Sequence, residues 1–82
     1  MSWLVYVLRC ADDTLYTGIT NDMDKRFAKH EAGTAAKYTQ NRGPFEIVYT
    51  ENCDDRSVAS KREYAIKQLS RSEKLSLIES SK

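Results

Sequence analysis

The stretch WLVYVLRC, residues 3–10, is apolar on both of the faces that a β-strand presents. Trp3, Val5 and Val7 would point to one side of the strand, and the residues between them to the other. β-Branched and aromatic residues favour strands, and a strand that is apolar on both faces is typical of the middle of a sheet. The sequence therefore predicts a central strand over residues 3–10.

The rest of the chain predicts two more strands and three helices. A turn signal at residues 11–14 places the second strand back against the first as a hairpin. The expected elements are strands over 15–19 and 45–49 and helices over 22–32, 56–69 and 71–79. This order, β-β-α-β-α-α, predicts an α/β fold class, an α+β sandwich in which helices flank a three-stranded antiparallel sheet. We expect one domain over residues 1–80, followed by a polar tail at 81–82.

The helix predicted over 22–32 has an apolar stripe and a basic flank. Met23 and Phe27 are one turn apart and would face the core. Arg26 and His30 are also one turn apart, and they would lie on a common flank beside that stripe. Their side chains can therefore point to the same place.

The helix predicted over 56–69 would begin at a capping Asp54 or Asp55. Its inner face would be formed by Val58, Ala65, Ile66 and Leu69. Glu63 lies roughly 100° or more from the middle of that face, so it is available either for chemistry or for solvent.

The composition is that of one small soluble domain. The 82 residues are 40% hydrophobic and 30% charged, and such a chain is too short for a second core. No apolar run approaches the roughly 20 residues of a membrane span, and no secretory signal pattern is present. Two cysteines are too few for a disulfide framework. We therefore expect a cytoplasmic protein with no membrane partner and no small-molecule cofactor, whose only metal would be a hard cation held by carboxylate and water.

The net charge is only +1, but the charges are segregated along the chain. Residues 25–43 hold five Lys and Arg against Glu31, and residues 56–71 hold five against Glu63, whereas the segments before and between them are acidic. Two basic segments that meet in the fold would form a patch for a polyanion such as nucleic acid. The alternative is that both are solvated helix faces.

Five polar side chains stand out, although each also has an ordinary structural explanation. Tyr6 and Tyr16 lie in the two strands of the hairpin and could simply pack across them. Arg26 and His30 could be part of an exposed basic helix face. Glu63 could be one half of a helical ion pair. None of the five is specific by itself.

Taken in order, however, these residues resemble the GIY-YIG nuclease family. The GIY element reads Leu4-Val5-Tyr6 and the YIG element reads Tyr16-Thr17-Gly18, with nine residues between the two tyrosines. The resemblance continues through Lys25-Arg26, His30, the segment GTAAKYT at 33–39 and Arg62-Glu63-Tyr64, so it covers nearly the whole chain. It is strongest to the small stand-alone bacterial subfamily of the UPF0213 type. The resemblance implies the GIY-YIG fold.

The resemblance also implies a divalent-metal-dependent endonuclease that hydrolyses phosphodiester bonds of nucleic acid, with a role in repair or recombination. In the family a glutamate on a helix holds a single divalent cation, which implies that Glu63 binds Mg²⁺ or Mn²⁺. Many members carry an Asn after that glutamate, and this chain has none after Asn52. Lys67 or Gln68, one turn beyond Glu63, could take its place.

Roles for the other residues follow from the same resemblance. Tyr6 is the candidate general base working on water, and Tyr16 would orient the water or the phosphate. Arg26 would contact the phosphate, and His30 would hydrogen-bond the tyrosine or relay its proton. A phenol with a reference pKa near 10 is a poor base, so we expect neighbouring cations to ease the loss of its proton. Gly18 would let the backbone turn tightly at the end of the second strand.

Contacts to phosphates would come from basic and aromatic side chains spread along the chain. The candidates are Lys25, Lys29, Lys37, Tyr38, Arg42, Arg62, Lys67 and Arg71. Such contacts position nucleic acid without reading its sequence, so we expect structure-selective or weakly specific cleavage, or targeting by a partner protein. DNA is favoured over RNA as the substrate. Two alternatives stay open: a non-catalytic nucleic-acid-binding module on the same scaffold, and a protein-interaction domain whose charges are only solvated.

Overall fold

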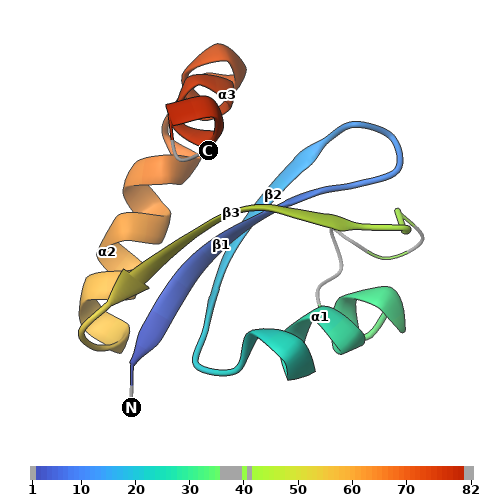
Figure 1. Cartoon of the computed structure of the whole chain (residues 1–82), viewed down its shortest axis with the longest axis horizontal. Helices are drawn as coiled ribbons and strands as arrows, with labels where there is room; N and C mark the ends of the chain where they lie inside the picture. The colour runs from blue at the N-terminus through green and yellow to red at the C-terminus, as the bar shows by residue number, and fades with distance from the viewer. Residues whose placement is uncertain (1, 36–39, 41, 81–82) are drawn as a thin grey trace.

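The computed structural model describes residues 2–35, 40 and 42–80, and it has the predicted order of strands and helices (Figure 1). The elements are β1 (Trp3–Arg9), β2 (Leu15–Thr20), α1 (Met23–Glu31), β3 (Glu46–Cys53), α2 (Arg56–Lys67) and α3 (Arg71–Ser80). Antiparallel pairing gives the sheet order β2-β1-β3, so both the central strand and the predicted fold class are confirmed. The predicted phosphate contacts Lys37 and Tyr38 and the tail at 81–82 lie outside the described residues.

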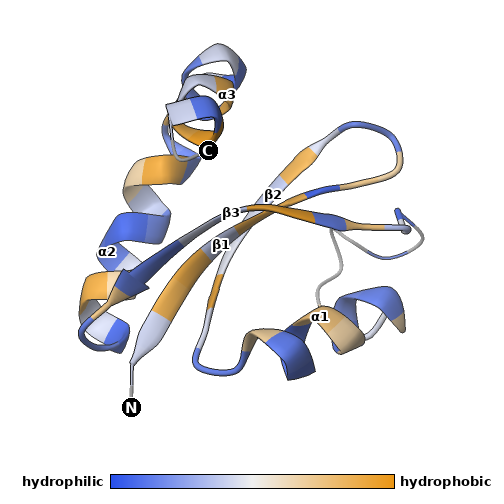
Figure 2. Ribbon diagram, in the orientation of Figure 1, coloured by the Kyte–Doolittle hydropathy of each residue, from blue (hydrophilic) through white to orange (hydrophobic). Residues whose placement is uncertain are grey.

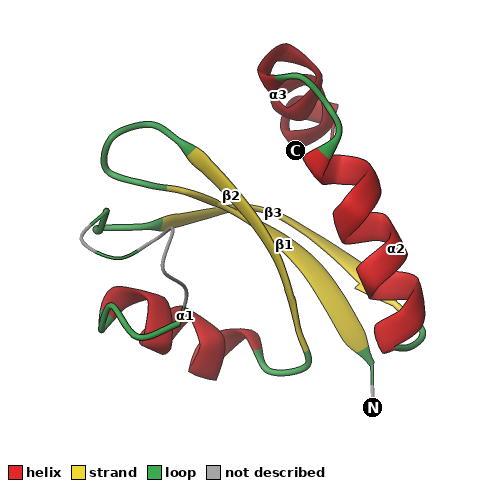
Figure 3. Ribbon diagram, turned by 180° about the vertical axis from the view of Figure 1, so that it is seen from behind, coloured by secondary structure: helices red, strands yellow, loops and turns green. Residues whose placement is uncertain are grey.

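The helices cover the two faces of the sheet separately. α1 lies on one side of the sheet, and α2 and α3 lie on the other (Figures 1 and 3). Val5 and Val7 of β1 pack in a core with Ile66 of α2, whereas Tyr6 and Leu8 pack in a second core that α1 covers. Figure 2 shows the hydrophobic colour along the middle of β1. The central strand is therefore buried on both faces, as its apolar pattern predicted.

α1 carries one buried stripe, which consists of Met23, Phe27 and His30. Met23 and Phe27 are half-buried, while His30 is only 1% exposed and is the deepest residue of the helix. The prediction that His30 lies beside this stripe is wrong, because its position seven residues after Met23 continues the same stripe. Asp22 caps the helix by accepting a hydrogen bond from a backbone N–H of the first turn. Gly33, with φ +79°, follows the last turn in the left-handed conformation.

α2 is rotated relative to the predicted orientation. Asp55 caps it by accepting a hydrogen bond from the backbone N–H of Val58. The predicted inner face is partly wrong, because Val58 is 45% exposed and Ala65 is also exposed. The helix instead faces the core with Ala59 and Ile66, which are both fully buried. Their spacing of seven residues defines the packed side of α2.

This rotation brings Glu63 toward the packed side of α2. Glu63 lies four residues after Ala59 and three before Ile66, so it shares their side of the helix. Its side chain is only 24% exposed. The sequence predicted that this carboxylate lies away from the inner face of the helix. Its partial burial is therefore the main difference between the predicted and the observed site.

β3 and the helix ends differ from prediction in their lengths. β3 runs to Cys53, four residues beyond the strand predicted over 45–49, because it pairs with β1 from Trp3 to Arg9. Three consecutive polar residues, Thr50, Glu51 and Asn52, precede the buried Cys53, and they concealed the extension.

None of the helices in the described part of the chain is long and apolar enough to cross a membrane.

Candidate active site

Tyr6 lies at the centre of the site and is completely buried. The antiparallel register places it directly opposite Gly18 of the edge strand β2. A Cβ atom at position 18 would lie 2.5 Å from Tyr6 Oη and 2.7 Å from its Cζ, so the phenol ring fills the space that any larger residue would need. The expectation of a tight turn at Gly18 is wrong, because β2 continues to Thr20. Gly18 instead lets the Tyr6 ring pass over β2.

The Tyr6 hydroxyl contacts two residues of α1. Arg26 Nε donates a hydrogen bond to Tyr6 Oη at 3.3 Å, and His30 Nε2 lies 2.8 Å from the same oxygen. The two side chains therefore converge on one atom, as their spacing of one turn indicated. A phenol O–H is a stronger donor than a neutral imidazole N–H, so we assign the proton of the second bond to Tyr6 and the Nδ1–H tautomer to His30.

Tyr16 completes this cluster from β2. Its ring centroid lies 6.3 Å from that of Tyr6 and 5.3 Å from that of His30. Hydrogen bonds with Tyr6 and Tyr16 raise the pKa of Arg26. Four of the five residues predicted to be catalytic thus share one face of the sheet, although they come from three separate elements.

Burial sets the ionisation of this cluster. Loss of hydration raises the pKa of Tyr6 above its ordinary value of 10.0, and the opposing hydrogen bond from Arg26 does not cancel it. Burial, together with the positive charge of Arg26, lowers the pKa of His30. Both rings are therefore neutral near pH 7. The expectation that neighbouring cations ease loss of the Tyr6 proton does not hold for the protein alone, because desolvation is the larger effect.

Glu63, the fifth predicted residue, approaches the cluster from α2. This helix packs against β2 and β1, and the negative charge of Glu63 is one of the causes that raise the pKa of Tyr6. The Glu63 carboxylate also forms an ion pair with Lys67, at 3.4 Å. The helical ion pair that the sequence allowed is therefore present, and it lies within electrostatic range of the tyrosine.

The donor set suits a cation that takes most of its ligands from water and substrate. Within the described ranges, no three His, Cys, Asp or Glu side chains gather to hold a metal. Mg²⁺ is often held by one or two carboxylates together with waters and substrate phosphates, so Glu63 alone fits such an ion. The Thr17 hydroxyl is buried and has no hydrogen-bond partner in the described part of the chain. Thr17 also lines a hollow of about 350 Å³ with Tyr16 and Lys67.

Lys25 and Lys29, two of the predicted phosphate contacts, lie near this cluster. They line a hollow that also includes Arg26. Arg56 lines the same hollow, and sequence reasoning missed it. The count of charges over residues 56–71 included Arg56, but the residue was not named among the phosphate contacts. Its position at the start of α2 was the available signal, because a helix start can lie close to the end of a neighbouring strand.

Arg62 is not brought to the cluster. Its Nε lies 2.8 and 3.0 Å from the two carboxylate oxygens of Glu51. Tyr49 donates a further hydrogen bond to Glu51, at 2.6 Å. Both of these partners are on β3, at the opposite edge of the sheet from β2. Arg62 therefore joins α2 to β3, and the structure gives no support to its predicted contact with phosphate.

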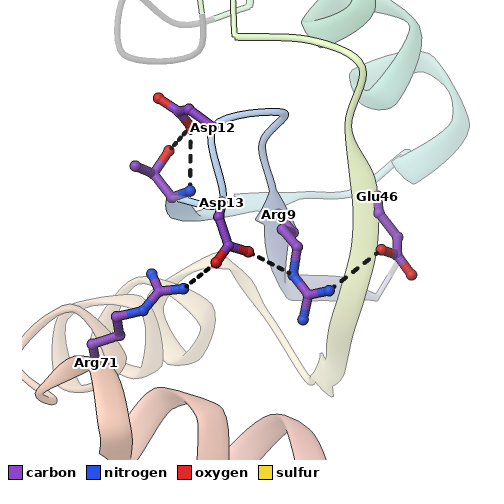
Figure 4. Close-up of polar contacts among 6 residues, drawn as sticks. Arg9, Asp12, Asp13, Glu46 and Arg71 are labelled. Atoms are coloured by element: carbon purple, nitrogen blue, oxygen red, sulfur yellow. Dashed lines mark hydrogen bonds and ion pairs between the residues drawn. The ribbon is translucent and has the colours of Figure 1, made fainter.

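Arg42 and Arg71 are held at the turn between β1 and β2. Arg42 pairs with Asp12, and Arg71 pairs with Asp13 at 3.2 Å. Figure 4 shows Asp13 between Arg71 and Arg9. These two arginines already have carboxylate partners, so the structure does not support their predicted role either.

Comparison with known proteins agrees with this arrangement. A profile of the GIY-YIG catalytic domain matches residues 2–76. The UPF0213 protein DP2720 of Desulfotalea psychrophila is 52% identical over 81 residues, which cover 98% of this chain and 74% of that protein. The UPF0213 protein OB0043 of Oceanobacillus iheyensis is 55% identical over 75 residues, covering 92% and 87% of the two chains.

A solved structure supports the same assignment. The solution NMR structure of the UPF0213 protein BH0048 from Bacillus halodurans superposes with a TM-score of 0.63 at 44% identity, covering 96% of this chain and 84% of that chain. The resemblance read from the tyrosines, arginine, histidine and glutamate is thus confirmed at the level of the whole domain. This protein belongs to the GIY-YIG family.

Proposed function

We propose that this protein is a divalent-metal-dependent endonuclease that hydrolyses phosphodiester bonds of nucleic acid, with DNA as the favoured substrate. One observation carries the proposal: the buried Tyr6 hydroxyl is held between the Arg26 guanidinium and the His30 imidazole. A buried phenol in a purely structural role needs one hydrogen-bond partner, whereas the Tyr6 oxygen has both an arginine and a histidine. Membership of a family whose profile describes a catalytic domain supports the same activity.

Proton transfer would run from water through Tyr6 to His30. Because the pKa of Tyr6 is raised, a free phenolate is scarce near pH 7. His30 is neutral there, since its pKa is lowered, and its Nε2 can accept the phenol proton. Tyr6 would therefore take a proton from the attacking water while it passes its own to His30. In this scheme His30 is the final acceptor and Tyr6 is the relay.

The developing charge on the phosphate would be met by Arg26 and by a cation at Glu63. Arg26 lines a hollow beside the cluster, so its guanidinium can contact both Tyr6 and a phosphate. A divalent cation at Glu63 would stabilise negative charge on phosphate oxygens as a Lewis acid. Tyr16, whose ring lies 5.3 Å from that of His30, would orient the water or the phosphate.

The test is incubation of the protein with labelled duplex, branched, flapped and single-stranded DNA, and with structured RNA, in Mg²⁺ or Mn²⁺. Wild type is compared with Glu63→Gln and Tyr6→Phe. Glu46→Gln is the matched control, because among the described residues Glu46 forms an ion pair with Arg9 alone, at the surface (Figure 4). We expect cleavage by wild type and control, and a loss of about 10²–10⁴-fold in Tyr6→Phe. Metal-independent cleavage that survives Glu63→Gln contradicts the proposal.

A non-catalytic nucleic-acid-binding module is the second candidate. The ion pair that Lys67 makes with Glu63 favours it, because this pair competes with a metal for the carboxylate. The absence of an Asn after Asn52 points the same way. This function predicts salt-sensitive binding, no cleavage with any divalent metal, and full tolerance of Tyr6→Phe.

A further inference from the structure

A basic hollow of about 400 Å³ lies beside the candidate active site. It is bounded by the start of β1, the segment from the end of β2 into α1, and the start of α2. Its charged and aromatic lining consists of Trp3, Asp22, Lys25, Arg26, Lys29 and Arg56. Four cations thus surround the hollow against a single carboxylate, which makes it a site of positive potential.

Three of these cations are available to an external anion. Within the described ranges, no carboxylate lies within ion-pair distance of Lys25, Lys29 or Arg56. Arg42, Arg62 and Arg71 contrast with them, because each is held by a carboxylate. The one acid of the hollow, Asp22, is engaged as the cap of α1, where it accepts a hydrogen bond from a backbone N–H.

Two contacts give the hollow a fixed shape and a direction. The Arg56 guanidinium lies over the Trp3 ring at 5.6 Å from its centroid, which restrains a side chain that would otherwise be flexible. Arg26 belongs both to the hollow and to the Tyr6 cluster, because its Nε donates to Tyr6 Oη while its side chain lines the hollow. An anion in the hollow is therefore adjacent to the site of the proposed chemistry.

We propose that this hollow is the subsite for the phosphodiester backbone next to the cleaved bond, on the same strand as the phosphate that Arg26 contacts. Lys25, Lys29 and Arg56 bind the flanking phosphates and position the strand without reading its bases. The catalytic meaning of the subsite rests on the proposed endonuclease function, but its occupancy by nucleic acid can be measured without cleavage.

The test measures binding of a short labelled DNA, as a single strand and as a duplex, by fluorescence anisotropy in EDTA over a series of salt concentrations. Lys29→Gln and Arg56→Gln each remove one cation of the hollow. Lys61→Gln is the matched control, because Lys61 is exposed on α2 and does not line the hollow. We expect each hollow variant to reduce the slope of log K against log salt by about 0.7 for the single strand or 0.9 for the duplex, and the control to leave it unchanged.

Trp3 is the single tryptophan of the chain, so its emission reports on the hollow. We expect the emission to change when either DNA is added to the wild-type protein. Slopes that are unchanged in both hollow variants, or binding that leaves Trp3 emission unaltered, overturns the subsite. Lys29→Gln keeps the test valid if Arg56→Gln disturbs Trp3, because Arg56 is the cation that lies over that ring.

The outcomes separate the subsite from the proposed function. Reduced slopes with no cleavage by wild type support the subsite and contradict the endonuclease. Cleavage that depends on Glu63, with unchanged slopes in both hollow variants, supports the endonuclease and overturns the subsite.

Discussion

Gly18→Ala should damage the protein through one contact with Tyr6. The added Cβ would lie 2.5 Å from Tyr6 Oη and 2.7 Å from Cζ, closer than real Cβ contacts come. The ring cannot swing away at little cost, because Tyr6 is completely buried and its hydroxyl is held by Arg26 and His30. Overpacking of this kind costs about 1–3 kcal/mol. For a domain of this size, each kcal/mol lowers Tm by about 4–8 °C.

The assay is urea denaturation and thermal melting of Gly18→Ala, followed by cleavage under single-turnover conditions. Gly33→Ala is the control: nothing lies within 4 Å of its added Cβ, but its φ of +79° strains an alanine, so stability falls while the cluster is untouched. We expect both variants to lose stability and only Gly18→Ala to lose cleavage, by about 10²-fold or more. A free energy of unfolding within about 0.5 kcal/mol of wild type in Gly18→Ala would refute the packing argument.

Three further outcomes follow from contacts outside the Tyr6 cluster and from its histidine. Asp55→Ala should lower the free energy of unfolding by about 1 kcal/mol through loss of the α2 cap, and Asp54→Ala should not, as urea denaturation will show. Arg62→Gln should cost at most about 1 kcal/mol and leave the affinity for labelled DNA unchanged, because Glu51 holds its guanidinium; weakened binding would contradict this. Burial lowers the pKa of His30 in the folded protein, so as the pH falls the unfolded chain binds a proton at this imidazole before the folded protein does. The free energy of unfolding is therefore highest above about pH 6.5 and falls as the pH drops toward the folded-state pKa. Urea midpoints unchanged between about pH 7 and 5 would contradict this linkage.

The order of elements followed from the sequence because local patterns determine it. The run at 3–10 is apolar on both sides, and the structure places it in the centre of the sheet. The helix predicted over 22–32 agrees with α1, which Asp22 caps and Gly33 follows, because the ends of a helix depend on residues within one turn. The rotation of α2 was missed, since Ala59 is too small to show in an apolar pattern while Val58 is large but exposed.

The sequence indicated which residues form the candidate site, but not how burial changes their pKa values or how they pack. Spacing alone brought Arg26 and His30 together on α1. It could not reveal that burial raises the pKa of Tyr6, because desolvation depends on how the second core closes around the ring. The part played by Gly18 was equally hidden, since it follows from the register that sets this residue opposite Tyr6.

The attachment of α3 has a consequence for how the domain opens. α3 is joined to the hairpin turn by the exposed pair of Asp13 and Arg71, and it contributes one fully packed side chain, Ile78. An exposed ion pair adds little free energy, so this helix is held mainly by that side chain and by Leu75 and Leu77, which are partly buried against the same core. We expect its amides to exchange with solvent as a separate unit, ahead of the sheet. The last ten residues of the described chain would then detach and return while the Tyr6 cluster on the opposite face of the sheet stays assembled.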